Sequence, residues 1–186
     1  MKLRDPDGSE RQPLFFSTAG EGRFDLAPVE SAMGTCYLGA DDLACVVEVF
    51  GRMRIIPPGL LQDYRVAVFS TAVELRLADA CEPVVLGQFG LTRELCTTPD
   101  YARTQEWARA WLDAGFAGIH YAPRHDPRGD LRAIALFGLA GPQNPVDVHL
   151  QLERMEPLGD ACLRQAARYG LYVADVPPFG PRLREE

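Results

Sequence analysis

The pattern of hydrophobic and polar positions divides the chain into several short strands and fewer helices. Over residues 73–77, Val73, Leu75 and Leu77 alternate with Glu74 and Arg76, which is the period of a half-buried strand. The same alternation runs over residues 146–153. Less regular apolar runs predict further strands over residues 35–38, 65–69, 116–121, 131–137 and 171–176.

Three segments have the capping residues and apolar content of helices. Residues 43–50 follow Asp41 and Asp42, either of which suits the N-cap, and precede Gly51, a natural residue just past a helix end. A second helix is predicted to open at Thr98-Pro99, with proline at its first position, and to close at Gly115. A third is predicted from Asp160 to Gly170.

Strands and helices do not alternate strictly, so the pattern predicts an α+β fold rather than a doubly wound sheet. The chain of 186 residues is 47% hydrophobic, which suffices for one sizeable core. We expect residues 1–14, which are polar and contain prolines, to form an N-terminal lead, and residues 15–186 to form one domain. Neither a G-x-G-x-x-G turn nor a Walker A loop is present.

Charge and cysteine usage exclude several classes of protein. The net charge is -7 and the pI is about 5.0, which argues against direct nucleic-acid binding, although local arginines can hold a nucleotide. No apolar run approaches the length of a membrane span or a signal peptide, so a cytoplasmic protein is expected. The five cysteines form no C-x-x-C pair and have no zinc-ligand spacing with the three histidines, so no metal or cofactor is expected.

Glu48 is the most unusual residue in the predicted helices. Val46, Val47, Val49 and Phe50 surround it, so the helix is expected to be buried. A carboxylate is rare in such a place unless it is paired or lines a cavity. The pattern alone leaves open a structural ion pair, with Arg52 or Arg54 as the partner, or a role in chemistry.

Four ordered blocks of sequence resemble the RES domain family. They are G-R-F-D at 22–25, G-T-C-Y-L-G-A-D-D-L-A-C-V-V-E-V-F-G at 34–51, L-D-A-G-F-A-G-I-H-Y-A-P-R-H-D at 112–126, and A-L-F-G at 135–138. The resemblance spans residues 17–138, about two thirds of the chain. Each block alone is weak, but their order makes the resemblance fairly specific.

The resemblance implies an ADP-ribosyltransferase-like fold whose central cleft takes NAD. Many RES domains are toxins of bacterial toxin–antitoxin pairs that deplete NAD, some by phosphorolysis. The positions of the family's motif fall on Arg23, Tyr37 and Glu48. A position that is usually serine falls on Pro123, so the expected hydroxyl is missing here. Arg124 or His125 would then take over its part in binding the substrate.

These residue types suit cleavage of NAD. Arginine binds a diphosphate through paired, charge-assisted hydrogen bonds, and a tyrosine ring can stack on nicotinamide. A fixed carboxylate stabilises positive charge that develops on the ribose. Within residues 124–132, Arg124, Arg128 and Arg132 are expected to form a positive pocket for the acceptor, which is phosphate or water.

The sequence therefore predicts an NAD-cleaving enzyme with Glu48, Arg23 and Tyr37 as catalytic residues, and Arg23, Tyr37, Arg124 and His125 binding substrate. NAD and phosphate are substrates, and a cognate antitoxin is the expected protein partner. A homo-oligomer is possible on this reading. Two alternatives stay open: an inactive RES-like module that binds a nucleotide or protein, and transfer of ADP-ribose to a protein. Residues 139–186 would complete the sheet, form a dimer face or bind the partner.

Overall fold

The computed structural model of the protein consists of short strands and short helices, and it describes residues 12–26 and 32–175. The strands are β1 Phe15–Phe16, β2 Met33–Gly39, β3 Ile55–Ile56, β4 Arg65–Ser70, β5 Leu77–Asp79, β6 Gly118–Tyr121, β7 Ala133–Leu139, β8 Gly141–Pro142, β9 Gln151–Pro157 and β10 Tyr172–Val173. The helices are α1 Asp42–Phe50, α2 Pro58–Leu61, α3 Pro83–Gln88, α4 Tyr101–Asp113 and α5 Asp160–Ala166, with 3-10 turns η1 Arg93–Cys96, η2 Pro145–Val148 and η3 Ala167–Tyr169. The predicted α+β class is confirmed.

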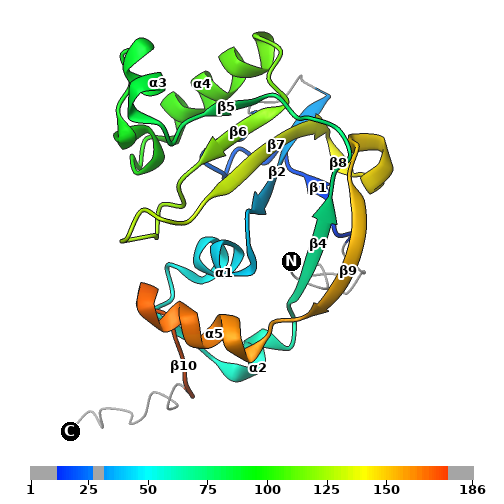
Figure 1. The fold of residues 1–186 in the computed structure, drawn as a ribbon, viewed down its shortest axis with the longest axis vertical. Coiled ribbons are helices and arrows are strands. Elements are labelled where there is room, and N and C mark those ends of the chain that lie inside the picture. Colours follow the sequence, from blue (N-terminus) through cyan, green and yellow to red (C-terminus); the bar gives the residue numbers. More distant parts are fainter. Residues whose placement is uncertain (1–11, 27–31, 176–186) are drawn as a thin grey trace, which may run out of the picture.

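A four-stranded sheet with the order β2-β7-β6-β5 forms the centre of the fold (Figure 1). β7 pairs antiparallel with both β2 and β6, whereas β5 joins the edge parallel to β6. Ala78, Ile119 and Ala135 point to one face, where Ala108 and Trp111 of α4 pack against them. Small side chains on the sheet let the large rings of the helix approach closely.

The opposite face of the sheet carries a second apolar cluster. Cys36 and Leu136 pack there against Leu14, Phe16 and Leu150. Leu14 is fully buried, so the packed structure begins no later than this residue, one position earlier than expected. Residues 1–11 of the expected lead lie outside the described residues.

A second sheet, the antiparallel pair β4–β9, arches from the central sheet down to α2 and α5 (Figure 1). α5 packs against α1 in a third cluster that includes Val47, Phe50 and Ala166. The part of residues 139–186 that the structure describes therefore completes the fold. None of the described helices is long and apolar enough to cross a membrane.

Two strand predictions are wrong in their placement. Residues 73–76 lie outside β5, which begins at Leu77, although their alternation is that of a strand. Over 146–149 the chain forms η2 and then a left-handed turn at His149, with φ of 59°, and β9 begins only at Gln151. Pro145 at the first position favours that turn over an extended strand.

Helix ends were predicted with mixed success. The Asp41 carboxylate caps α1 by accepting a hydrogen bond from the Ala44 amide, as expected for one of the two aspartates. The second helix begins two residues later than predicted, because Asp100 rather than Thr98 is its N-cap. Gly51 has φ of -56°, so it is not the left-handed residue expected after α1.

Candidate functional site

The Glu48 carboxylate lies at the centre of the predicted site. Its Oε1 accepts a 3.1 Å hydrogen bond from the Tyr121 hydroxyl. Its Oε2 is buried and has no hydrogen-bond partner, the only side-chain atom of this kind among the described residues. Burial raises the pKa of Glu48 above the ordinary 4.5. A buried carboxylate oxygen without a hydrogen-bond partner is costly, and this cost calls for an explanation.

Tyr121 ends β6 and is almost completely buried, with 1% of its surface exposed. Its ring packs edge-on against Phe24 at 5.1 Å and Tyr37 at 6.4 Å between centroids. Burial and the nearby Glu48 carboxylate raise its pKa well above 10.0, so the hydroxyl remains a donor. Tyr121 was not predicted as a site residue from the sequence. The available signal was its place directly before the polar loop in the third family block.

Arg23 is buried in the same region and is held by the segment before α4. Its guanidinium donates to the Thr98 carbonyl at 2.6 Å and lies 5.0 Å from the centre of the Tyr101 ring. Burial lowers its pKa, while the charges of Tyr101 and Glu48 oppose this shift. Arg23 and Glu48 are therefore close enough to influence each other electrostatically, without an ion pair between them.

The loop that carries Arg23 is fixed through Tyr37 and Asp25. The Tyr37 hydroxyl donates to Asp25 Oδ1 at 2.9 Å and accepts from the Phe24 amide at 2.8 Å. The other Asp25 oxygen accepts from the Gly22 amide at 2.9 Å. A Cβ on Gly22 would overlap both the Tyr37 hydroxyl and the Asp25 carboxylate. Tyr37 thus supports the loop, and its hydroxyl is already engaged.

Two polar side chains of α4 hold the same loop from the other side. Thr104 donates to the carbonyl of Arg23, and Gln105 donates to the carbonyls of Gly20 and Gly22 at 2.9 Å each. Both side chains are buried. They explain why an otherwise amphipathic helix carries polar residues on its packed side.

His125 lies where several arginines gather. Its Cβ and ring pack so closely on Gly51 that a Cβ there would overlap them, which is the physical reason for a glycine after α1. Burial lowers the pKa of His125, and the positive charges of Arg124, Arg52, Arg54 and Arg23 lower it further. In a chain of net charge -7, this is a local concentration of positive charge beside Glu48.

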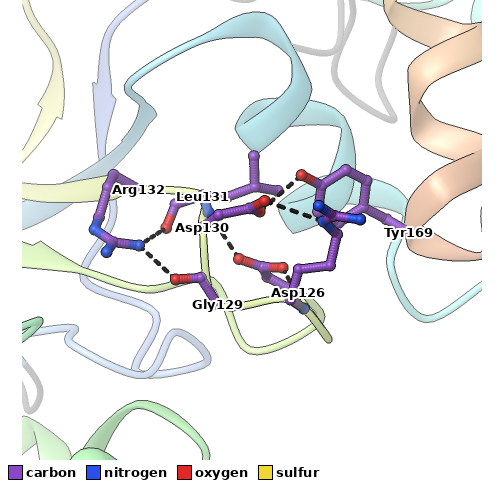
Figure 2. Close-up of polar contacts among 7 residues, drawn as sticks. Asp126, Gly129, Asp130, Leu131, Arg132 and Tyr169 are labelled. Atoms are coloured by element: carbon purple, nitrogen blue, oxygen red, sulfur yellow. Dashed lines mark hydrogen bonds and ion pairs between the residues drawn. The ribbon is translucent and has the colours of Figure 1, made fainter.

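The other two arginines of the loop after β6, Arg128 and Arg132, form polar contacts within that loop (Figure 2). Arg128 forms an exposed ion pair with Asp130 at 3.0 Å, and Asp130 also accepts a 2.7 Å hydrogen bond from Tyr169. Arg132 donates to the carbonyl of Gly129 at 2.9 Å. These bonds shape the loop rather than a pocket.

The acceptor pocket of Arg124, Arg128 and Arg132 therefore stays a prediction, and two of its three arginines have contacts within their own loop. Arg124 is grouped with Arg52 from the segment after α1, and Arg52 in turn donates to the Tyr101 hydroxyl at 3.3 Å. From the sequence, Arg52 was considered only as an ion-pair partner of Glu48. In the structure the charge of Arg52 acts on both Glu48 and His125, and the hydrogen-bond partner of Glu48 is Tyr121.

Pro123 is buried, and its carbonyl accepts a 3.2 Å hydrogen bond from the Asp126 amide. It offers no hydroxyl to the site. Cys36, next to Tyr37, is no alternative nucleophile, because burial raises the pKa of its thiol to about 11.

A cleft of about 420 Å³ lies between α1 and the β4–β9 pair. Its lining is mainly apolar and includes Val49, Val66 and Leu150, and Glu48 and Tyr37 border it. Arg23, Tyr121 and Arg124 are not among its lining residues. The cleft and the arginine group thus flank Glu48, one apolar and the other positively charged.

A family model of the RES domain matches residues 3–156 of the 186-residue chain. The chain belongs to the RES domain family. The resemblance seen in its four sequence blocks is confirmed, and the match extends beyond them at both ends.

A solved structure of the M. tuberculosis MbcT-MbcA toxin-antitoxin complex is similar in fold. The likeness has a TM-score of 0.57 with 19% sequence identity, and covers 78% of this RES domain chain and 76% of that chain. Among curated proteins, the comparison found no match. At this identity the likeness shows a shared fold alone.

Proposed function

We propose that this RES domain protein cleaves NAD at the bond between nicotinamide and ribose and passes ADP-ribose to inorganic phosphate. The observation that carries the proposal is the buried Glu48 carboxylate, with one oxygen bound by Tyr121 and the other without a partner. A substrate that brings positive charge would compensate that oxygen. The sugar of NAD becomes such a group as its bond to nicotinamide breaks.

The chemistry needs one carboxylate and no strong acid. As the C1′–N bond breaks, its electron pair moves to the nicotinamide nitrogen, which loses its positive charge and leaves as a neutral molecule. Positive charge develops on the ribose, and Glu48 Oε2 stabilises it. A phosphate oxygen then forms the new bond to C1′. Tyr121 keeps the carboxylate in place by occupying its other oxygen.

The arginines serve the anionic parts of the reaction. NAD carries a diphosphate and the acceptor is itself an anion, so both require positive charge close to Glu48. Arg23 is held rigidly by Thr98 and Tyr101, and Arg52 and Arg124 lie around His125. We assign the diphosphate to Arg23 and the acceptor to Arg52 and Arg124. Arg124 and His125 would thus compensate for the hydroxyl absent at Pro123.

The apolar cleft beside α1 suits the leaving group. The volume of the cleft lies in the range of small-molecule binding sites. Its mainly apolar lining favours neutral nicotinamide over the positively charged ring that nicotinamide forms within NAD. Nicotinamide gains an apolar environment once it has become neutral. Glu48 lies at the border of the cleft, whereas the Tyr37 ring packs against Tyr121 on the face of the sheet that α4 covers, and the Tyr37 hydroxyl supports the loop.

We further propose that this activity makes the protein the toxin of a toxin–antitoxin pair. The support is the family membership and the fold shared with a structure described as a toxin-antitoxin complex. Induced expression of the wild type should deplete cellular NAD and stop growth, whereas Glu48→Gln should do neither. Normal NAD levels and growth with well-expressed wild-type protein would contradict the toxin role.

Purified protein incubated with NAD, with and without inorganic phosphate, tests the reaction itself. Chromatography should show nicotinamide and phosphorylated ADP-ribose only when phosphate is present. Equal release of nicotinamide without phosphate would show that the reaction is hydrolysis rather than phosphorolysis. Transfer of ADP-ribose from NAD to a protein would indicate ADP-ribosylation. Tight NAD binding without cleavage would favour an inactive binding module, which is the reading that Pro123 supports.

A further inference from the structure

Three side chains of metal-binding type meet at the edge of the central sheet, away from Glu48. Asp79 ends the edge strand β5 and pairs directly with His120 of the neighbouring parallel strand β6. Cys81 follows two residues after Asp79, and the Ala80 amide extends the pairing to the His120 carbonyl at 2.8 Å. Ala80 points into the core, so strand alternation places Asp79, Cys81 and His120 on the opposite face.

The candidate ligand atoms of these residues all lie within 4.8 Å of one another. His120 Nδ1 is 3.5 Å from Asp79 Oδ1, and the same oxygen accepts hydrogen bonds from the amides of Cys81 at 2.8 Å and Glu82 at 3.3 Å. Those amide bonds fix the turn that presents the Cys81 thiol. Tetrahedral zinc with bonds of about 2.0–2.3 Å needs ligand atoms roughly 3.3–3.8 Å apart, which small side-chain rotations provide.

We propose that Asp79, Cys81 and His120 bind a zinc ion. Thiolate, imidazole and carboxylate are the three ligand types of zinc in proteins, whereas magnesium and calcium prefer oxygen alone. A thiolate and a carboxylate together match the double positive charge of the ion. Three protein ligands leave the fourth tetrahedral position to water.

The site is open enough to be filled from solvent. The side chains of His120 and Asp79 are 34% and 44% exposed, and Cys81 is half-buried. Bound zinc would link the edge strand β5 to β6 through His120, the residue directly before Tyr121. This inference stands independently of NAD cleavage.

Linear spacing does not reveal such a site. Cys81 and His120 come from neighbouring strands whose connection includes α3, η1 and α4, so no short zinc pattern arises. The expectation of no metal rested on sequence spacing alone. Only the parallel pairing of β5 with β6 brings the three residues together.

Metal content and cobalt spectroscopy test the proposal on the full chain. Purified protein is stripped with a chelator, titrated with zinc, and separately loaded with cobalt, whose thiolate-to-metal absorption reports a cysteine ligand. Cys81→Ser and His120→Asn each remove one ligand. Asp79→Asn removes the charge but keeps an acceptor for the two turn amides. Cys162→Ser and His149→Asn are matched controls, since Cys162 has a similarly raised thiol pKa of about 11 and His149 lies in η2's left-handed cap.

The proposal predicts one zinc ion per chain, a cobalt–thiolate band, and a higher melting temperature with zinc. Each ligand variant should lose more affinity than the roughly 10–100-fold that outer-shell partners contribute, while both controls bind normally. Absence of zinc binding by the folded wild type, or unchanged binding in Cys81→Ser and His120→Asn, would overturn it. Rapid alkylation of Cys81 without any metal uptake would overturn it as well. If one variant fails to fold, the cobalt band of the wild type still decides.

Discussion

The Tyr121 hydroxyl donates a 3.1 Å hydrogen bond to Glu48 Oε1 and thereby joins the end of β6 to the last turn of α1. Tyr121 is fully packed among aromatic rings, so it holds the carboxylate from a rigid position. The other carboxylate oxygen is left without a partner among the described residues. The reaction that we propose uses this second oxygen.

Tyr121→Phe should shift the pH dependence of activity. The hydrogen bond from Tyr121 lowers the pKa of Glu48, in opposition to burial. Its loss should move the acid limb of the kcat profile to higher pH and cost about 1–2 kcal/mol of stability, because the acceptor stays buried. Tyr169→Phe is the matched control, since it loses a 2.7 Å bond to Asp130 and leaves the hydrogen bond of Glu48 in place. Identical profiles for the two variants would contradict the role of Tyr121.

Glu48 should also make stability depend on pH. Its pKa in the folded state is raised above 4.5, so the folded protein holds the proton more tightly than the unfolded chain does. The stability contributed by Glu48 is therefore fully present below pH 4.5 and is lost as pH rises through the folded-state pKa. Relative to wild type, Glu48→Gln should gain about 1.4 kcal/mol for each pH unit between the two pKa values. Denaturant unfolding at a series of pH values measures this difference, and a pH-independent difference would refute a raised pKa.

Gly22→Ala should disrupt the loop that carries Arg23. The new methyl group would overlap the Tyr37 hydroxyl and the Asp25 carboxylate, both of which are locked in hydrogen bonds. We expect a loss of about 1–3 kcal/mol and a large fall in kcat/KM. Gly59→Ala in α2 is the control, since its Cβ meets nothing within 4 Å and should leave both quantities unchanged or slightly raise stability. Equal effects of the two substitutions would remove the argument for a packed loop.

Arg52→Ala and Arg124→Ala should weaken the binding of phosphate, the acceptor that we assign to these two arginines. Loss of a charge-assisted contact of about 1.5–3 kcal/mol raises KM by roughly 10–100-fold. Arg128→Ala should leave the KM for phosphate and the KM for NAD unchanged, because Arg128 forms an ion pair with Asp130 within its own loop. Steady-state kinetics with each substrate varied in turn gives these values. A KM effect at Arg128 as large as that at Arg124 would restore the pocket first expected from the sequence.

Local rules predicted much of the fold. The Asp41 cap places α1, and the left-handed glycines Gly115 and Gly170 end the segments of α4 and α5–η3 as expected. The errors occur where tertiary contacts override local pattern. Residues 73–76 alternate like a strand, but pairing with β6 begins only at Leu77. Gly51 looked like a left-handed cap, whereas its space is taken by His125.

The site was predictable in its residue types but not in its contacts. Glu48 was recognisable as an acid in an apolar helix, and the family blocks pointed to Arg23 and Tyr37. Its actual partner, Tyr121, lies far away in sequence, so only the fold reveals it. The same holds for Arg52 and Arg124, which come from different segments and meet around His125. Spacing along the chain carries no information on such pairs.

Nicotinamide release from NAD by purified protein, followed in the wild type and in Glu48→Gln, tests the central claim most directly. The account predicts phosphate-dependent release by the wild type and a rate at least about 10²-fold lower for Glu48→Gln. Glu106→Gln, on the exposed side of α4, should behave like the wild type. Full activity in a folded Glu48→Gln protein, or no release by the wild type with NAD and phosphate present, would contradict it.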